Sequence, residues 1–339
     1  MRYFLMNKRQ GEKETRKFLI LLISILSGLF NLSLFAESQG PGSKNSRPNQ
    51  GVPLFVDVNK DLAPKAKAVL DSFYVNCSFE ADGKQFGFEW HEIIYRLPQG
   101  NFTSTEFLLM NGSGDHFYPN TLSEPLNKNS APDGQLFVSS SLGELKGDQK
   151  AMSLRLHSAK GQVDVVLRPR KEVLYNGTTG LLNLGGSKSY EYAYPNMNVE
   201  GTVVINDREY KVNNATAWFD RQWAGEPNAD SGSDQMKIMS SSWLWLGMPL
   251  NEDMTAAISL WDLYVDDGRN ACATILNKNG TQINVPASIT YETIWTSAGS
   301  GFKYPRKVHV SIPEENWPVL SIVDTLNYAD FFLSKKDSA

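Results

Sequence analysis

Short strand-like segments separated by turn residues recur along most of this chain, and this spacing limits the fold more than any other feature. Apolar and polar residues alternate around turns within residues 72–97, 151–169 and 198–212, and residues 256–285 form a three-strand meander. The turns are expected at Asp82-Gly83, Lys160-Gly161, Asn206-Asp207, Asp267-Gly268 and Asn279-Gly280. Turn signals at a spacing of about eight to twelve residues are typical of β-sandwiches and β-barrels. The sequence therefore predicts an all-β protein.

The chain of 339 residues is long enough for two ordinary domains or one large all-β unit. A polar, turn-rich run from Ala224 to Ser240 separates two sets of predicted strands and is interpreted as the connection between domains. We therefore expect an N-terminal β domain over residues 52–225 and a C-terminal β domain over residues 226–339.

The N-terminus resembles an export signal. Basic residues from Lys8 to Lys17 precede an apolar run over residues 18–36 that ends in Leu34-Phe35-Ala36. This pattern predicts a signal peptide over residues 1–36 and a secreted or periplasmic protein, and the alternative is a membrane anchor formed by residues 18–36. Residues 37–51 are rich in Ser, Gly, Pro and Asn and are expected to form a flexible linker.

Composition excludes several classes of function. The formal charge of −4 gives no basic patch, so nucleic acid is not an expected partner. The four histidines are scattered, so no metal site is expected, and no phosphate- or nucleotide-binding motif is present, so no cofactor is expected. Cys77 and Cys272 form either one long-range disulfide or two buried apolar residues. The oligomeric state stays open.

The run AWFDRQW, residues 217–223, combines aromatic residues with adjacent opposite charges. In a strand the side chains alternate, so Trp218 and Asp220 share one face, and Arg221 and Trp223 share the other, where the guanidinium can stack on the indole. An apolar wall raises the pKa of a carboxyl group and keeps it protonated, which suits a general acid. The alternative is that Asp220 and Arg221 belong to a structural ion-pair network.

Further strands also carry aromatic residues on one face. Trp243 and Trp245 alternate with leucines, Asp262 lies on the face opposite Trp261, and Tyr192 belongs to a one-sided tyrosine stripe in SYEYAYP. Such alternation is also the pattern of an ordinary strand in a protein core. His91, beside Trp90, is interpreted as a surface histidine or as one satisfied by a structural hydrogen bond.

The run YEYAYPNMNVEGTVVINDREYKVNNATAWFDRQWAG resembles the hallmark of the carotenoid 1,2-hydratase and kievitone hydratase superfamily. The segments LDSFYVNCSFEADGKQFGF and SWLWLGMPLNEDMTAAISLWD are similar to neighbouring segments of that family. The resemblance implies two packed lipocalin-like β-barrel or sandwich domains with an apolar pocket at or between them. The late Y-W-E-G segment of the family is not found, so the C-terminal barrel is expected to be incomplete or closed differently.

The resemblance also implies a hydratase that protonates an alkene of an apolar prenyl or isoprenoid substrate. Asp220 is then expected as the acid, Asp262 as the base that positions water, and Arg221 as the group that keeps one carboxylate ionised. The expected substrate-binding aromatic residues are Trp218, Trp223, Trp243, Trp245, Tyr192 and Trp261. The alternatives are a secreted lipocalin-like binder of an apolar ligand without turnover, or a pericyclase of the Diels–Alder type.

Overall fold

The computed structural model describes the larger part of the chain. The described residues are 2–5, 21–24, 53–111, 117–126, 134–170, 172–184, 187–225, 242–251, 254–265, 268–296, 303–312 and 320–323. Apart from the short strands β1 (Arg2–Leu5) and β2 (Leu21–Ser24), the predicted signal and linker lie outside these residues. The predicted connection between domains also lies outside them from residue 226 to residue 240. No helix in the described part is long and apolar enough to cross a membrane.

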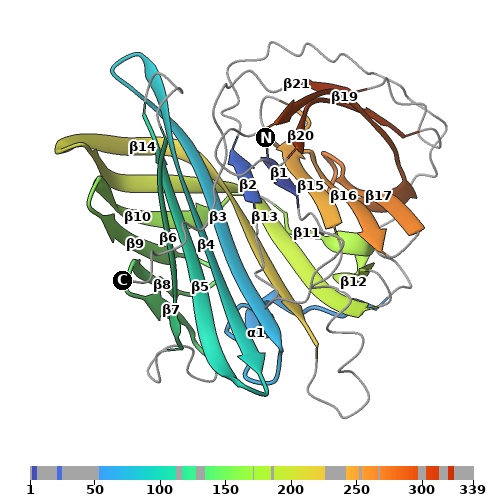
Figure 1. Ribbon diagram of the computed structural model, residues 1–339, viewed down its shortest axis with the longest axis horizontal. Coiled ribbons are helices and arrows are strands. Elements are labelled where there is room, and N and C mark those ends of the chain that lie inside the picture. Colours follow the sequence, from blue (N-terminus) through green and yellow to red (C-terminus); the bar gives the residue numbers. More distant parts are fainter. Residues whose placement is uncertain are drawn as a thin grey trace.

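The chain is nearly all β, as predicted, and a twelve-stranded antiparallel sheet curls into a nearly closed barrel (Figure 1). Its strand order is β6-β5-β4-β3-β14-β13-β10-β9-β8-β7, with β11 and β12 paired to β13. The bounds are β3 Leu70–Ala81, β4 Lys84–Leu97, β5 Gly100–Met110, β6 Phe117–Pro125, β7 Leu136–Ser140, β8 Gly143–Gly147, β9 Met152–Ser158, β10 Gly161–Pro169, β11 Leu174–Tyr175, β12 Leu181–Leu184, β13 Ser187–Ile205 and β14 Arg208–Ala224.

The barrel seam lies between the edge strands β6 and β7. The carboxylate of Glu124 on β6 accepts hydrogen bonds from the backbone N–H of Ser141 at 2.6 Å and from its Oγ at 2.5 Å. Ser141 follows directly after β7, so this contact joins the two sheet edges where no backbone ladder is formed.

Two of the predicted hairpin turns have the backbone that their sequence favours. Asp82 and Gly83 both have positive φ, at 52° and 69°, and Asn206 and Asp207 have φ of 50° and 64°. Two consecutive positive φ angles match the right-handed twist of the flanking strands in a two-residue hairpin. Asn, Asp and Gly tolerate that conformation better than other residues. Local turn chemistry thus fixes the β3–β4 and β13–β14 hairpins.

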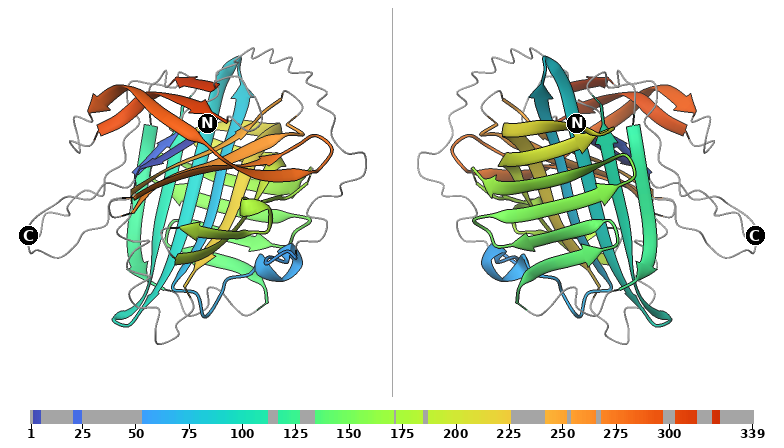
Figure 2. Two further views of the ribbon diagram at one scale, coloured as in Figure 1. Left: turned by 90° about the vertical axis from the view of Figure 1, so that its right-hand side faces the viewer. Right: turned by 90° about the vertical axis from the view of Figure 1, so that its left-hand side faces the viewer.

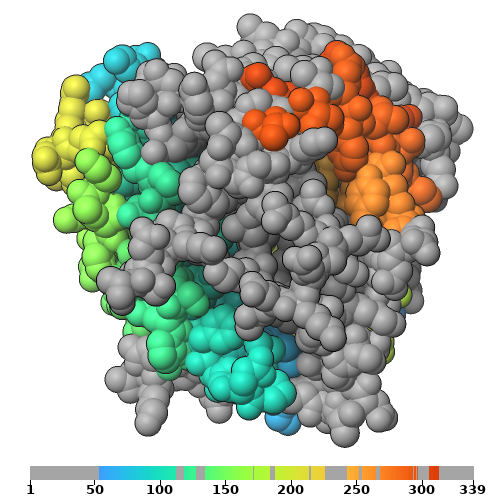
Figure 3. Space-filling model, viewed as in Figure 1, coloured from blue at the N-terminus to red at the C-terminus, as the bar shows by residue number. Residues whose placement is uncertain are grey.

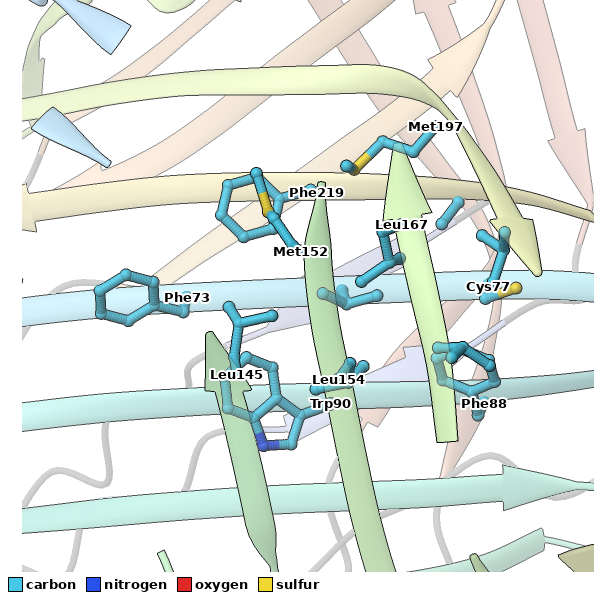
Figure 4. Close-up of a cluster of buried hydrophobic side chains, with 14 of the residues drawn as sticks. Phe73, Cys77, Phe88, Trp90, Leu145, Met152, Leu154, Leu167, Met197 and Phe219 are labelled. Atoms are coloured by element: carbon cyan, nitrogen blue, oxygen red, sulfur yellow. The ribbon is translucent and has the colours of Figure 1, made fainter. Parts of the chain in front are cut away.

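The barrel interior is packed with large apolar side chains from opposite walls (Figure 4). Phe73 and Cys77 on β3 and Trp90 on β4 face Leu145 on β8 and Leu154 on β9. Each of these side chains is fully buried. Cys77 is a free thiol here, and Cys272 is a free, half-buried thiol on another sheet, so the two do not form a disulfide.

The C-terminal part forms two smaller antiparallel sheets, coloured orange to red in Figure 2. The first contains β15 Ser242–Pro249, β16 Ala257–Val265, β17 Gly268–Leu276 and β18 Gln282–Pro286, and the second contains β19 Ser288–Thr296, β20 Lys303–Ser311 and β21 Leu320–Val323. A second hydrophobic cluster joins the first of these sheets to the outer face of the barrel, through Tyr74, Leu108, Ala193 and Trp218. The barrel wall is therefore buried on both faces along β3 and β14.

A segment before β3 closes one end of the barrel, and Arg221 on β14 holds it there. The short helix α1 (Val58–Asp61) begins this segment. The Arg221 guanidinium lies 2.6 Å from Asp71 Oδ1 and donates to the carbonyl oxygens of Ala63 at 2.9 Å and Leu62 at 3.3 Å. Further hydrogen bonds to the carbonyl oxygens of Ser72 and Gln222 bring the carbonyl acceptors of this guanidinium to four. Arg221 and Asp71 are fully buried, so this pair is an internal anchor.

A second buried carboxyl group, Glu92 on β4, lies inside the barrel. Thr103 Oγ1 donates to Glu92 Oε1, and Thr105 Oγ1 donates to Glu92 Oε2 at 2.6 Å. Burial raises the pKa of Glu92 to about 7, although these hydroxyl groups lower it. Because the folded state holds this proton more tightly than the unfolded chain does, Glu92 favours folding most at low pH.

Asp71→Asn is expected to lower the free energy of unfolding by about 3–5 kcal/mol, because it leaves the Arg221 charge buried without its partner. Asp164→Asn is the control: Asp164 pairs with Arg155 at the surface, where both side chains are more than half exposed. That control should cost no more than about 1 kcal/mol. Urea unfolding measures both changes, and equal losses would contradict the anchor role of Asp71.

Glu92→Gln is expected to flatten the dependence of stability on pH. The contribution of Glu92 in the wild type is complete below its unfolded pKa near 4.5 and is lost as pH rises through about 7. That loss is about 3 kcal/mol, at about 1.4 kcal/mol for each tenfold change in proton affinity. Urea unfolding of both proteins across this interval measures the difference. Parallel stability profiles would show that the Glu92 carboxyl does not titrate there.

Candidate functional site

Strand β14 presents its two charged residues to different surroundings, as the alternation in AWFDRQW predicts. Trp218 belongs to the cluster between the barrel and the β15–β18 sheet, whereas Phe219 and Trp223 belong to the barrel core. The Arg221 guanidinium lies 5.0 Å from the Trp223 ring centroid and 4.1 Å from that of Phe73. Asp220 therefore faces the second sheet, while Arg221 faces the barrel interior.

The register of the barrel sheet aligns Asp220 with further polar residues on its outer face. Asp220 pairs with Tyr74 on β3, Tyr74 with His91 on β4, and His91 with Glu106 on β5. We call Asp220, Tyr74, His91 and Glu106 the polar row. Directly paired residues have Cβ atoms roughly 4.5–5.5 Å apart, so their side chains are neighbours. All four are buried, with at most 8% of each residue exposed.

Hydrogen bonds and ring contacts orient the members of the polar row. Trp218 Nε1 donates to Asp220 Oδ1 at 2.6 Å, which favours the ionised form of that carboxyl. Ser72 Oγ lies 2.9 Å from His91 Nε2, within hydrogen-bonding distance. The Tyr74 ring meets the His91 ring edge-on at 5.4 Å between centroids. His91 is thus buried and hydrogen-bonded, which fits the prediction of a satisfied histidine and not that of a surface one.

Aromatic side chains from the β15–β18 sheet cover part of this row. The Trp245 ring lies edge-on to Trp218 at 5.9 Å and to Tyr74 at 6.0 Å between centroids. Trp245 Nε1 donates to Ser259 Oγ at 3.1 Å. Trp243 is half-buried against the same cluster. The predicted aromatic residues Trp218, Trp243, Trp245 and Trp261 therefore gather between the barrel and this sheet.

Glu191 on β13 lies on the same outer face and was not singled out from the sequence. It pairs with Gln222, two residues from Asp220 on β14, so the two carboxyl groups are diagonal neighbours. Burial, and then the charge of Asp220, raise the pKa of Glu191 well above its usual range. Among the described residues, Glu191 Oε2 and the facing Trp261 Nε1 are both buried without a hydrogen-bond partner. Such atoms cost roughly 1–3 kcal/mol each unless a ligand or water satisfies them.

Three of the predicted site residues lie on the inner face of the barrel wall. Tyr192 is fully buried there and pairs with Arg221 across β13 and β14. Trp223 packs beside them in the barrel core. Asp220 and Arg221 lie on opposite faces of β14, as the alternation predicts, and the ion-pair partner of Arg221 is Asp71.

Asp262 is also separated from the polar row. It is fully buried on the face of β16 that turns toward β19, opposite Trp261. Arg269 Nε and Nη2 each lie 2.8 Å from its oxygens, and Tyr291 on β19 donates a further hydrogen bond. The structure does not bring Asp262 and Asp220 together, because β16 lies between them.

Two further features bear on what this part of the chain can bind. A surface hollow lies next to α1 and the β7–β8 hairpin and is lined by Asn59, Leu62 and Lys146 among others. It contains no member of the polar row. Among the residues that the structure describes, no group of three His, Cys, Asp or Glu side chains could hold a metal ion.

Figure 3 shows the barrel strands, coloured blue to yellow, on the left of this view and the C-terminal strands, in orange and red, on the right. Sequence reasoning missed Tyr74, Glu106 and Glu191 as members of the site. Glu191 had a local signal, because it lies in SYEYAYP on the face opposite the tyrosine stripe. Tyr74 and Glu106 had no such signal, since only the pairing of β3, β4 and β5 aligns them with Asp220.

Comparisons with known proteins point to one family. A family model for AttH-like proteins matches residues 53–326. The chain is 24% identical over 173 residues to a curated protein named dehydratase asqC from Emericella nidulans, a match that covers 48% of this chain and 46% of that protein. The chain thus spans about half the length of that curated relative.

Solved structures share the fold. An AttH protein from Nitrosomonas europaea matches with a TM-score of 0.66 at 18% identity, over 79% of this chain and 85% of that one. Kievitone hydratase from Nectria haematococca matches with a TM-score of 0.63 at 16% identity, over 79% of this chain and 80% of that one. The family resemblance predicted from AWFDRQW and its flanking segments is therefore confirmed.

Gly247→Ala is expected to displace the aromatic cluster. A Cβ atom at Gly247 would lie 2.6 Å from the Trp245 ring and 3.0 Å from Trp218, so the rings must move. Overpacking of this kind costs about 1–3 kcal/mol. The near-ultraviolet circular dichroism of the tryptophans should change, whereas Ser288→Ala at an exposed strand position should leave it unaltered. An unchanged tryptophan spectrum in Gly247→Ala would contradict this packing.

Proposed function

This chain belongs to the AttH-like family, and we propose that it is a hydratase- or dehydratase-type enzyme acting at the polar row on an apolar substrate of the prenyl or isoprenoid class. The names of two similar proteins, kievitone hydratase and dehydratase asqC, support this reaction class. A hydratase converts an alkene into an alcohol by adding water, and a dehydratase carries out the reverse reaction. The substrate class is the one that the family resemblance implies, and the aromatic side chains between the barrel and the β15–β18 sheet suit it.

The observation that carries the proposal is a pair of buried carboxyl groups, Asp220 and Glu191, beside tryptophan rings. Protonation of an unactivated alkene forms a tertiary carbocation, which requires a strong acid in a site with little water. The faces of Trp218, Trp245 and Trp261 suit that cation, because aromatic rings attract positive charge. A second carboxylate then accepts a proton from the attacking water.

The two carboxyl groups have different surroundings, and this difference separates an acid from a base. Asp220 accepts the Trp218 Nε1 hydrogen bond, whereas Glu191 Oε2 has no partner among the described residues. Tyr74 and His91 extend the polar row away from Asp220 and offer groups that could contact a polar end of the substrate. The predicted signal peptide over residues 1–36 would place the reaction outside the cytoplasm.

Asp220→Asn is expected to lower turnover at least about 100-fold, the usual cost of losing one acid–base group. Residues 37–339 and the variant would be incubated with prenylated phenols, carotenoid precursors and fatty acids, and mass spectrometry would report products that differ by one water. Asp164→Asn, at an exposed surface pair, should keep wild-type turnover. A ligand that the wild type retains without any product would overturn the enzymatic proposal in favour of a carrier. A product of unchanged mass but altered structure would favour a pericyclase.

A further inference from the structure

Glu191 and Asp220 form an interacting pair on the outer face of the barrel wall, and the pair sets where a proton is held. They are diagonal neighbours on β13 and β14, and at most 8% of either residue is exposed. Two carboxyl groups this close and this buried do not both ionise readily, because each charge raises the free energy of the other. The structure therefore favours one proton shared unequally between them.

Hydrogen bonding decides which carboxyl group is ionised. Asp220 Oδ1 accepts a charge-assisted hydrogen bond of 2.6 Å from Trp218 Nε1. Glu191 has a weaker donor: its Oε2 is buried without a hydrogen-bond partner among the described residues, and the nearby Trp261 indole lowers the pKa of Glu191 less than burial and the charge of Asp220 raise it. The negative charge is therefore more stable on Asp220, and the proton is more stable on Glu191.

No cation on the neighbouring described strands pairs with Glu191. Arg221, the residue after Asp220 on β14, points into the barrel and is paired with Asp71. From β17, the thiol of Cys272 faces Glu191, and burial together with the Glu191 carboxyl raises the pKa of that thiol. None of the described residues forms a salt bridge with Glu191, and burial and the charge of Asp220 raise its pKa more than the Trp261 indole lowers it. These surroundings stabilise the neutral form of Glu191.

We propose that Glu191 carries the proton that is given to the substrate and that Asp220, ionised beside it, is the base of the same reaction. This assignment rests on the proposed hydratase-type function and reverses the role expected for Asp220 from the sequence. It makes Glu191 a catalytic residue, and it gives Trp218 a second role, since its Nε1 hydrogen bond favours the ionised form of Asp220.

The steps balance as follows for hydration. The Glu191 carboxyl gives its proton to one alkene carbon, so a C–H bond forms from the π electrons and the other carbon becomes a cation. Water attacks that cation and forms the C–O bond, and Asp220 takes the released proton. Transfer of this proton from Asp220 to Glu191 restores the starting state, and dehydration follows the same path in reverse. The net change is addition of one water, with no oxidant or cofactor.

Infrared difference spectroscopy of the full chain tests the location of the proton without a substrate, because a protonated carboxyl group absorbs apart from a carboxylate. At about pH 8 the Glu92 carboxyl, whose pKa is about 7, is mostly ionised and Glu191 is expected to remain protonated. A protonated-carboxyl band should be present in the wild type, be absent in Glu191→Gln, and persist in Asp220→Asn. The matched control Glu92→Gln should keep the band.

Isotope labelling assigns the protonated-carboxyl band to glutamate or aspartate in the wild-type protein, without any substitution. The band should shift in protein labelled with heavy carbon at glutamate side chains and stay in place in protein labelled at aspartate. A shift with labelled aspartate, or a band that survives in folded Glu191→Gln, overturns the proposal.

Kinetics then separate this proposal from the proposed function. Glu191→Gln should lower turnover at least about 100-fold. The wild-type profile should fall at low pH, where Asp220 is protonated, and at high pH, where Glu191 is ionised. The high-pH limb should vanish from the residual activity of Glu191→Gln.

Full activity of Glu191→Gln, with Asp220→Asn inactive, would overturn the assignment of the proton donor and leave the hydratase function standing. A wild type without any turnover would overturn the proposed function, while the infrared band would still decide where the proton lies.

Discussion

The buried guanidinium of Arg221 is the interaction on which the rest of the structure depends. It is paired with Asp71 and donates hydrogen bonds to four backbone carbonyl oxygens, two in the segment before β3, one on β3 and one on β14 itself. A slip of one residue along β14 would turn this charge to the outer face and put Asp220 into the apolar core. The Arg221 anchor therefore fixes the register of β14, and with it the direction in which Asp220 points.

The register of β14 then determines the composition of the outer face. Asp220, Tyr74 and His91 align because β14 pairs with β3 and β3 pairs with β4. The same pairing on the other side of β14 brings Glu191 diagonal to Asp220. Polar groups on an outer barrel face would normally be solvated, but the β15–β18 sheet covers them here. The polar residues of the site are therefore buried because the β15–β18 sheet covers the outer face of the barrel.

Burial of carboxyl groups in the barrel wall works against stability. Carboxyl groups removed from water cost free energy unless they are neutralised or fully hydrogen-bonded. On the inner face Asp71 is paired with Arg221, whereas on the outer face burial and the charge of Asp220 raise the pKa of Glu191, which favours its neutral form. A buried group whose protonation state is shifted by its neighbours is typical of sites that move protons.

The sequence predicts the local parts of this structure well. The hairpins at Asp82-Gly83 and Asn206-Asp207, the alternating faces of AWFDRQW and the stacking of Arg221 on Trp223 all depend on neighbouring residues, and all are present. The partners of those residues depend on contacts between distant segments. Asp71 is separated from Arg221 by most of the barrel sequence, so no local pattern identifies it as the partner of Arg221.

Contacts between distant segments also decide which site residues the sequence could predict. Trp218, Trp245 and Trp261 are recognised as aromatic residues on strands, and they gather between the two sheets. Asp262 has the same local pattern as Asp220, an aspartate among aromatic residues, but it faces β19 and is paired with Arg269. Which face of a strand meets which sheet is set by tertiary packing, and alternation within one strand does not contain that information.

Photo-crosslinking tests most directly whether the outer face of the barrel wall is the reaction site. A prenylated phenol with a diazirine in its prenyl chain would be irradiated with the full chain, and mass spectrometry would identify the labelled peptides. Label is expected on the peptides that contain Trp218, Trp245 or Trp261, and excess unlabelled ligand should reduce it. Label confined to barrel-core residues such as Phe88 and Leu154 would contradict it.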